Sequence, residues 1–159
     1  MTADHADLEG GCACRAMRYR LRRKPIFVHC CHCTWCQRET GSAFAVNALI
    51  EASEVEVLHG APVRSVLPSA SAKGQTVWRC ADCGVPLWSN YPQAGPKIHF
   101  VRVGTLDEPP RAPPDIHIYT STKLPWVIIP DGVPAVQEFY KPAEQWPSDG
   151  LARFRATRG

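Results

Sequence analysis

The sequence contains no long hydrophobic run, no internal repeat and no low-complexity segment. No apolar stretch approaches the roughly 20 residues that a membrane-spanning helix needs. The first residues, MTADHADLEG, are polar and acidic and lack the apolar stretch of a secretory signal. We therefore expect a cytoplasmic protein with no membrane partner. No window shows the sustained period of an amphipathic helix, which disfavours a mainly helical fold.

An excess of either charge is also missing, because 18 Lys and Arg stand against 15 Asp and Glu, for a net charge of +3. Basic residues concentrate in one segment, RAMRYRLRRK at 15–24. Arginines alternate there with Met17, Tyr19 and Leu21, as in a strand with one buried and one solvated face. We interpret the segment as the solvated side of a strand rather than as a nucleic-acid interface.

Short apolar runs rich in β-branched and aromatic residues recur along the chain, and prolines and glycines separate them. Such runs are typical of strands in an all-β protein. One short helix is expected over TWCQRET at 34–40, with Thr34 as its N-cap and Gly41 as its end. Residues 1–7 have the character of a flexible tail, and we expect a single domain over residues 8–159. The expected strands are 16–21, 25–30, 42–50, 54–60, 75–80, 85–90, 97–104, 115–120 and 125–130.

Cysteine is the residue type whose use is unusual. The chain has 8 cysteines, and without a secretory signal we expect them to be reduced. Their clustering therefore points to metal binding rather than to disulfides. They form three groups in the sequence: Cys12 and Cys14; Cys30, Cys31, Cys33 and Cys36; Cys80 and Cys83.

The two outer pairs fit one structural zinc site. Cys80-Ala-Asp-Cys83, followed by Gly84, has the spacing of a zinc knuckle, in which two thiolates face one ion. Two thiolates do not close a tetrahedron, and Cys12 and Cys14, on one face of an extended segment, can supply the other two. The alternative is four free cysteines that bind no metal.

The middle group predicts a second and different zinc site. Cys31, Cys33 and Cys36 can present three sulfurs from one turn and the start of the following helix. Three protein ligands leave the fourth position for water or a substrate group, as in catalytic zinc sites. Alternatively, a fourth neighbouring side chain closes the site and makes it structural. The candidates for that fourth ligand are His29, Cys30 and His32.

The motifs GGCACRAMRYR, CHCTWCQRETGSAF, CADCGVPLW, VGTLD and LPWVIIPDGVP occur in this order. In these motifs the chain resembles the glutathione-dependent formaldehyde-activating enzyme (GFA) family, which includes centromere protein V. The resemblance extends over most of the chain. It has two departures: Arg15 stands where the family often has glycine, and Cys30 has no place in the family's metal pattern.

The resemblance implies an all-β fold of two packed antiparallel sheets organised around zinc, with at most one or two short helices. It implies an activity that condenses glutathione with formaldehyde to an S-hydroxymethyl adduct, formally a carbon–sulfur lyase reaction in reverse. The second zinc site would be the catalytic one. The implied ligands are Cys12, Cys14, Cys80 and Cys83 for a structural zinc, and Cys31, Cys33 and Cys36 for a labile, exchangeable zinc.

A thiol and a small aldehyde are thus the expected small-molecule partners. Glutathione carries two carboxylates, for which Arg38, Arg102 and Lys123 are the candidate partners. Trp35 and Trp126 are candidates for the walls of a substrate cleft.

Two other functions stay open from the sequence. One is a zinc-stabilised binding module in which both metals are structural and nothing is turned over. The other is a redox protein that uses Cys30, the one cysteine outside both implied zinc sites.

Overall fold

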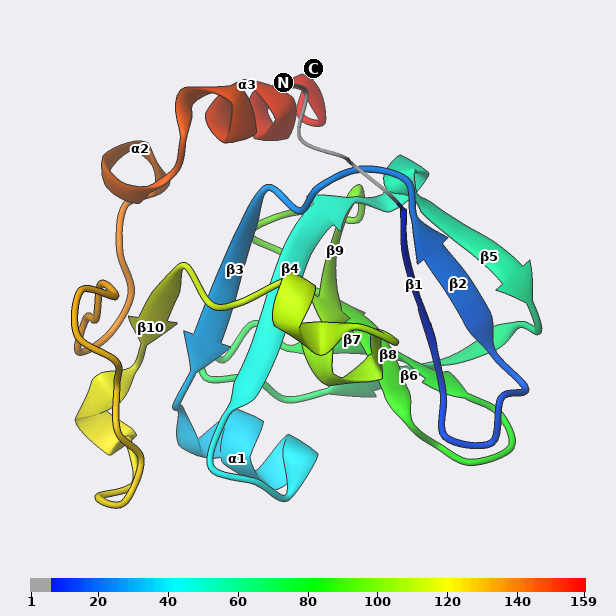
Figure 1. Ribbon diagram of the computed structural model, residues 1–159, viewed down its shortest axis with the longest axis horizontal. Coiled ribbons are helices and arrows are strands. Elements are labelled where there is room, and N and C mark those ends of the chain that lie inside the picture. The colour runs from blue at the N-terminus through cyan, green and yellow to red at the C-terminus, as the bar shows by residue number, and fades with distance from the viewer. Residues whose placement is uncertain (1–6) are drawn as a thin grey trace.

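The structure is a computed structural model that describes residues 7–159, and most of its regular structure is β (Figure 1). Residues 1–6 of the expected N-terminal tail lie outside the described residues. The strands form two sheets, which confirms the expected mainly β, two-sheet fold. The single domain over residues 8–159 stays a prediction.

The smaller sheet consists of three antiparallel strands, β1 (Leu8–Gly11), β2 (Arg18–Leu21) and β5 (Val55–His59). On β2 the side chain of Tyr19 is buried, whereas the two neighbouring arginines reach acidic partners. Arg18 Nη1 donates to Asp107 Oδ1 at 2.9 Å, and Arg20 Nη2 donates to Glu9 Oε1 at 2.7 Å. Arg18 and Arg20 of the basic run therefore lie on the outer face of a strand and are paired with carboxylates, whereas its other basic residues lie outside β2.

The larger sheet has seven strands in the order β10-β3-β4-β9-β8-β7-β6. Neighbours run antiparallel except β10 and β3, which are parallel and depart from the expected pattern. In chain order the strands are β3 (Phe27–Cys31), β4 (Ala45–Glu51), β6 (Pro62–Leu67), β7 (Gln75–Cys80), β8 (Pro86–Asn90), β9 (Ile98–Arg102) and β10 (Ile116–Ile118).

Both faces of the larger sheet carry a buried apolar cluster. Between the two sheets, the rings of Tyr19 and Trp88 meet edge to face with centroids 5.6 Å apart. On the opposite face, Phe27 and Leu49 pack in one cluster with Trp146 from the C-terminal segment. Because side chains alternate along a strand, successive residues of β3 and β4 enter different clusters.

Helix α1 (Thr34–Thr40) has the bounds that the sequence predicts. Its N-cap is Cys33 rather than Thr34, because the Cys33 sulfur accepts a hydrogen bond from the backbone N–H of Cys36 at 3.3 Å. Gly41 ends the helix with φ of 64°, in the left-handed region that glycine enters without a Cβ clash.

The C-terminal part of the chain departs most from the sequence-based expectation. Residues 125–130, predicted as a strand, form a turn and an irregular segment. Prolines bound this segment and lack a backbone donor, and the side chains of Trp126 and Ile128 are exposed rather than packed on a sheet. No helix among residues 7–159 is both long and apolar enough to cross a membrane.

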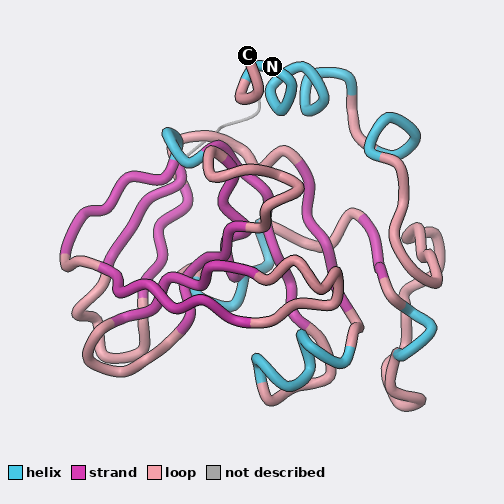
Figure 2. The backbone as a smooth tube through the Cα atoms, turned by 180° about the vertical axis from the view of Figure 1, so that it is seen from behind, coloured by secondary structure: helices cyan, strands magenta, loops and turns pink. Residues whose placement is uncertain are grey.

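Two helices that the sequence analysis missed follow this segment, α2 (Pro142–Gln145) and α3 (Ser148–Ala156). They lie at the edge of the strand-rich body in both backbone views (Figures 1 and 2). The remaining helical turns are short 3-10 helices: η1 (Ala52–Glu54), η2 (Val103–Thr105), η3 (Pro109–Arg111) and η4 (Thr120–Thr122).

Candidate metal centres and cavity

The two outer cysteine pairs meet in space, as the sequence predicts. Cys12 and Cys14 lie in the loop between β1 and β2, Cys80 ends β7, and Cys83 lies in the turn before β8. Their four sulfurs all lie within 4.8 Å of one another. The Cys12–Cys14 and Cys14–Cys80 sulfur distances are 3.5 Å and 3.7 Å. Four thiolates around a zinc ion with Zn–S bonds of about 2.3 Å would be about 3.8 Å apart, so the spacing suits zinc.

Backbone geometry on both sides of this group turns the sulfurs inward. Gly84 has φ of 73°, and its N–H donates to the carbonyl of Cys80 at 3.0 Å, which closes the tight turn around Cys83. Arg15 has φ of 65°, a left-handed conformation that a non-glycine residue rarely adopts. This conformation explains in physical terms why a glycine suits the position of Arg15. The backbone N–H of Val85 holds the pKa of the Cys83 thiol below its usual value.

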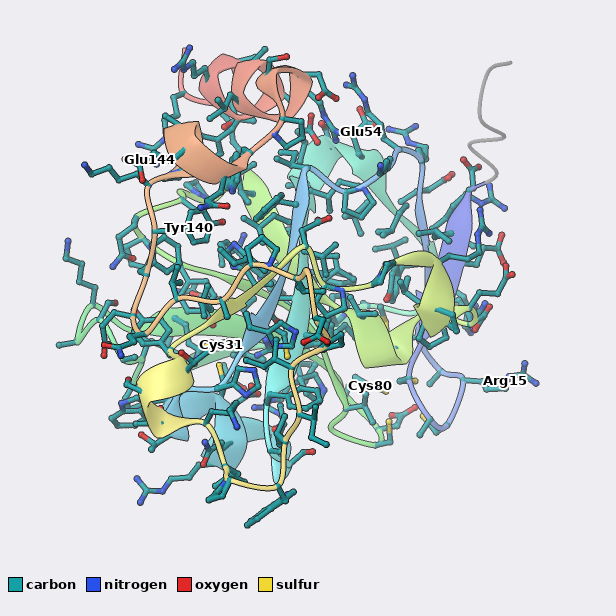
Figure 3. All side chains as sticks on the ribbon, turned by 60° about the vertical axis from the view of Figure 1, so that its left-hand side comes forward. Arg15, Cys31, Glu54, Cys80, Tyr140 and Glu144 are labelled. Atoms are coloured by element: carbon teal, nitrogen blue, oxygen red, sulfur yellow. The ribbon has the colours of Figure 1, made fainter. Side chains whose placement is uncertain are left out.

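The second group comes from the end of β3 and the start of α1. Cys31 is the last residue of β3, Cys33 is the N-cap of α1 and Cys36 lies in its first turn. Their sulfurs lie within 4.8 Å of one another, and all three side chains are buried. Hydrogen bonds from the Cys31 and Cys36 thiols, and from backbone N–H groups of α1, lower the pKa of Cys33. Negative charge is therefore favoured on the Cys33 sulfur, whereas the neighbouring thiols and burial raise the pKa of Cys31 and Cys36. Figure 3 shows Cys31 and Cys80, one from each group, well apart in the molecule.

In the described part of the chain, the three sulfurs have no fourth partner of a ligand type. Among residues 7–159, no other Cys, His, Asp or Glu places its ligand atom in this group. Cys30 and His32, two of the candidates for closing the site, point to the other face of the sheet. There the Cys30 sulfur lies 3.6 Å from His32 Nε2, and His32 Nε2 lies 2.8 Å from His117 Nδ1. Burial raises the pKa of the Cys30 thiol to about 12.

His29, the third candidate for a fourth ligand, has another partner. Its Nε2 is hydrogen-bonded to the hydroxyl of Tyr140, which also accepts a hydrogen bond from Trp146 Nε1 at 2.6 Å. Since the tyrosine oxygen already accepts from Trp146, its own proton is best directed at His29. Burial lowers the pKa of His29 to about 3, so the ring is neutral.

A cavity of about 430 Å³ lies beside the second cysteine group, and Cys31, Cys33 and Cys36 line it. Trp35, predicted as a possible cleft wall, lines the cavity, whereas the exposed Trp126 does not. Much of the remaining wall comes from the C-terminal segment that follows β10. These C-terminal lining residues, which the sequence analysis did not identify, are Phe139, Pro142, Trp146, Phe154 and Arg158.

The residues proposed from sequence as carboxylate partners lie elsewhere. Arg102 is buried beside the cavity wall, where its Nη2 donates to Glu39 Oε2 at 2.5 Å and to Ser89 Oγ at 3.1 Å. Lys123 donates to two backbone carbonyls of the following loop, and Arg38 is exposed on α1. None of the three is among the residues that line the cavity.

The fold defines a cysteine-rich β protein with three groups of potential metal ligands among residues 7–159. Two are the cysteine groups, one of which lines a cavity, and the third consists of Cys30, His32 and His117. Comparison with known proteins agrees: the chain matches the glutathione-dependent formaldehyde-activating enzyme (GFA) family over residues 7–122 and belongs to that family. All seven cysteines of the two groups fall inside this match.

Two individual proteins are also similar. A Halomonas elongata protein with the provisional name glutathione-dependent formaldehyde-activating enzyme is 26% identical over 158 residues, which is 96% of each chain. A crystal structure of a Rhodobacter sphaeroides protein has a TM-score of 0.45 and 21% identity, and the likeness covers 62% of this chain and 87% of that one.

Proposed function

We propose that this chain is a zinc-dependent enzyme that condenses a thiol with formaldehyde or a related small aldehyde. The observation that carries the proposal is the group of three cysteines on a cavity wall, with no fourth ligand-type side chain in the group among residues 7–159. The family description names glutathione as the thiol and formaldehyde as the aldehyde. The reverse reaction breaks a carbon–sulfur bond and belongs to lyase chemistry.

The donor sets of both groups suit zinc. Four thiols at these distances suit a closed, structural tetrahedral site, and three buried thiols beside a cavity suit an open site. Bound in the open site, zinc would supply a vacant position and positive charge that keep an incoming thiol deprotonated. The proposed ligands are Cys12, Cys14, Cys80 and Cys83 for the structural ion, and Cys31, Cys33 and Cys36 for the exchangeable one.

The chain's own residues prepare the cavity for this reaction. The backbone N–H of Cys36 donates to the Cys33 sulfur and favours a thiolate there. The apolar walls beside the thiols provide surroundings in which electrostatic interactions are stronger than in water. Because the Nε2 of His29 accepts from Tyr140, the proton of this neutral ring lies on Nδ1. His29 lines the cavity, and its engagement by Tyr140 holds the ring in place.

The bond changes balance without a redox partner. The sulfur of the thiol forms a bond to the carbonyl carbon of the aldehyde, and the carbonyl π pair moves to oxygen. The proton lost by the thiol ends on that oxygen, which gives the S-hydroxymethyl product. Uncatalysed addition of this kind is already fast, so the protein need supply only a modest lowering of the barrier.

The test is exchange NMR of glutathione with formaldehyde, on protein whose zinc content has been measured beforehand. We expect exchange faster than the spontaneous rate, and we expect chelation to abolish the acceleration. Cys33→Ser should lose the acceleration and one zinc while keeping the other zinc. Cys30→Ser is the matched control, because Cys30 faces the opposite side of the sheet, and it should behave like the wild type. Full acceleration in Cys33→Ser would exclude the second site from the reaction.

The ligands of the second zinc distinguish the proposed enzyme from a non-catalytic binding module. X-ray absorption of the fully loaded protein should show a mixture of sulfur and one lighter scatterer at that site. A signal from sulfur and histidine nitrogen alone, with no exchangeable oxygen, would support a closed structural site and contradict the proposal.

A further inference from the structure

We infer that the C-terminal segment 139–158 selects the substrate, and that the cavity takes a thiol with an aromatic body and a single carboxylate held by Arg158. The placement of the thiol sulfur at Cys31, Cys33 and Cys36 rests on the proposed function. The chemistry of the walls does not, because it follows from the residues that line the cavity.

The walls of the cavity are mainly apolar, and aromatic rings form a large part of them. Phe139, Trp146 and Phe154 from the C-terminal segment contribute to it together with Trp35 and Phe100. Trp146 and Phe154 meet edge to face with centroids 5.2 Å apart, so their positions are fixed by mutual packing. Such walls bind an aromatic ligand most favourably, because the ligand buries apolar area and adds ring contacts.

The cavity has a single ionised side chain of fixed charge. Among the described residues that line it, Arg158 is the one Lys, Arg, Asp or Glu. Arg158 is exposed, donates to the backbone carbonyl of Gln93, and holds its guanidinium 4.8 Å from the centre of the Phe154 ring. The cation therefore stands at the cavity mouth, next to an aromatic wall, where a ligand carboxylate can reach it from solvent.

This arrangement is a poor match for the whole of glutathione. Glutathione carries two carboxylates, an ammonium group and two amides. Apart from the cysteine group, the described lining residues include one cationic side chain and no acidic one, and the neutral polar ones can hydrogen-bond the amides but not neutralise a charge: Asn47, Ser69, Ser71, Gln75 and Gln93. An ionised group that enters an apolar cavity without a partner loses its hydration and gains nothing in return. The three cationic residues proposed from sequence lie outside the lining, so they do not correct the mismatch.

The residues that line the cavity come from two parts of the chain. The three thiols lie within residues 7–122, which match the family, and all five C-terminal wall residues lie beyond residue 122. The segment that matches the family thus supplies the reactive group and part of the aromatic wall, Trp35 and Phe100, and residues 139–158 complete that wall.

The experiment measures binding of unreactive thioethers to the zinc-loaded protein by fluorescence of the lining tryptophans. The probes are the S-methyl ethers of thiolactate, β-phenylthiolactate, phenethyl thiol and glutathione. We expect the phenyl group to lower the Kd by about tenfold between the first two probes. The glutathione ether should bind at least about tenfold more weakly than the β-phenylthiolactate ether.

A pair of variants tests the carboxylate contact. Arg158→Gln should raise the Kd of the β-phenylthiolactate ether about fivefold and leave that of the phenethyl ether within about twofold. Arg155→Gln is the matched control, because this exposed arginine of α3 does not line the cavity. An equal effect of the two substitutions, or equal loss for both probes, would overturn the role of Arg158.

The outcomes separate this inference from the proposed function. If the aromatic ethers bind more tightly but no thiol is condensed faster than its spontaneous rate, the ligand class stands and the reaction is wrong. If glutathione is condensed and its ether binds as tightly as the aromatic one, the reaction stands and the inference is wrong.

Discussion

The guanidinium of Arg153 donates two hydrogen bonds to the carboxylate of Glu51, from Nε to Oε1 at 2.8 Å and from Nη2 to Oε2 at 2.5 Å. Both side chains are largely buried. The pair joins helix α3 to the last residue of β4, a central strand of the larger sheet. Because Phe154 follows Arg153 directly, this contact also fixes one aromatic wall of the cavity.

Breaking this pair should loosen the C-terminal segment. We expect Arg153→Gln to lower the free energy of unfolding by about 2 kcal/mol, between the values for exposed and for fully buried ion pairs. Binding of the aromatic thioethers should weaken as well, because the Phe154 wall loses its anchor. Urea unfolding and fluorescence titration measure the two effects. Arg155→Gln, on the same helix, should change neither, and a similar loss in that control would contradict the role of the pair.

Because of the same pair, the free energy of unfolding should depend on pH in the acid range. Burial alone would raise the pKa of Glu51, but the hydrogen bonds and charge of Arg153 outweigh it and hold the pKa below its ordinary value of 4.5. The stabilisation is therefore fully present above about pH 4.5 and is lost as the pH falls through the lower folded value. We expect the stability difference between wild type and Glu51→Gln to shrink in that window. Taking the difference cancels metal loss common to both proteins; a difference that is constant down to pH 3 would refute the assignment.

Removing one exposed thiol should test the structural zinc without removing a core side chain. Cys14 is exposed, so Cys14→Ser disturbs little packing. We expect this variant to bind one zinc fewer and to lose several kilocalories per mole of stability, because binding of a structural metal is part of the folding free energy. Metal analysis and thermal unfolding provide the readouts. Wild-type stability at reduced zinc content would show that the fold does not depend on this ion.

The hydroxyl of Tyr140 should matter for stability. Tyr140→Phe removes the common partner of His29 and Trp146 and leaves two buried nitrogen atoms without a hydrogen bond. We expect a loss of about 1–3 kcal/mol in urea unfolding, the range for unsatisfied buried polar groups. Zinc content should stay unchanged, because none of the three residues belongs to a cysteine group. Loss of the second zinc in this variant would mean that His29 supports the metal directly.

Cys30 should be inert towards oxidants. Its side chain is 1% exposed and faces His32 rather than the cavity. We expect Cys30→Ser to leave the rate of peroxide inactivation unchanged, since burial protects a thiol from solution reagents. Mass spectrometry of peroxide-treated protein should find oxidation at other cysteines first. Early sulfenic acid formation at Cys30 would revive the redox function that the sequence leaves open.

The second cysteine group could be predicted from the sequence because its grouping is local. The spacing of Cys31, Cys33 and Cys36, followed by Gly41, is enough to predict both a short helix and the grouping of its sulfurs. Threonine at position 34 has the usual preference for an N-cap, yet the sulfur one residue earlier takes that role. Local preference therefore locates the helix but does not determine which side chain caps it.

The selective half of the cavity could not be predicted because it depends on long-range packing. Arg158 and Phe154 reach the cavity because α3 packs against the larger sheet through long-range contacts such as that of Arg153 with Glu51, which no local pattern reveals. Strand β10 pairs in parallel with β3 and so brings His117 beside Cys30 from a distant part of the sequence. Strand β1 was missed because its glycines and its place next to the expected tail conceal the pairing.

Cys30 and Cys31 are consecutive in β3, yet one thiol faces His32 in the interior and the other faces the cavity. The number of residues between the start of β3 and helix α1 is consequently as important for the site as the identity of the cysteines. Insertion or deletion of a single residue in this strand would exchange the two thiols and direct the wrong one to the cavity. Evolutionary change in this strand should thus proceed by substitution rather than by insertion or deletion.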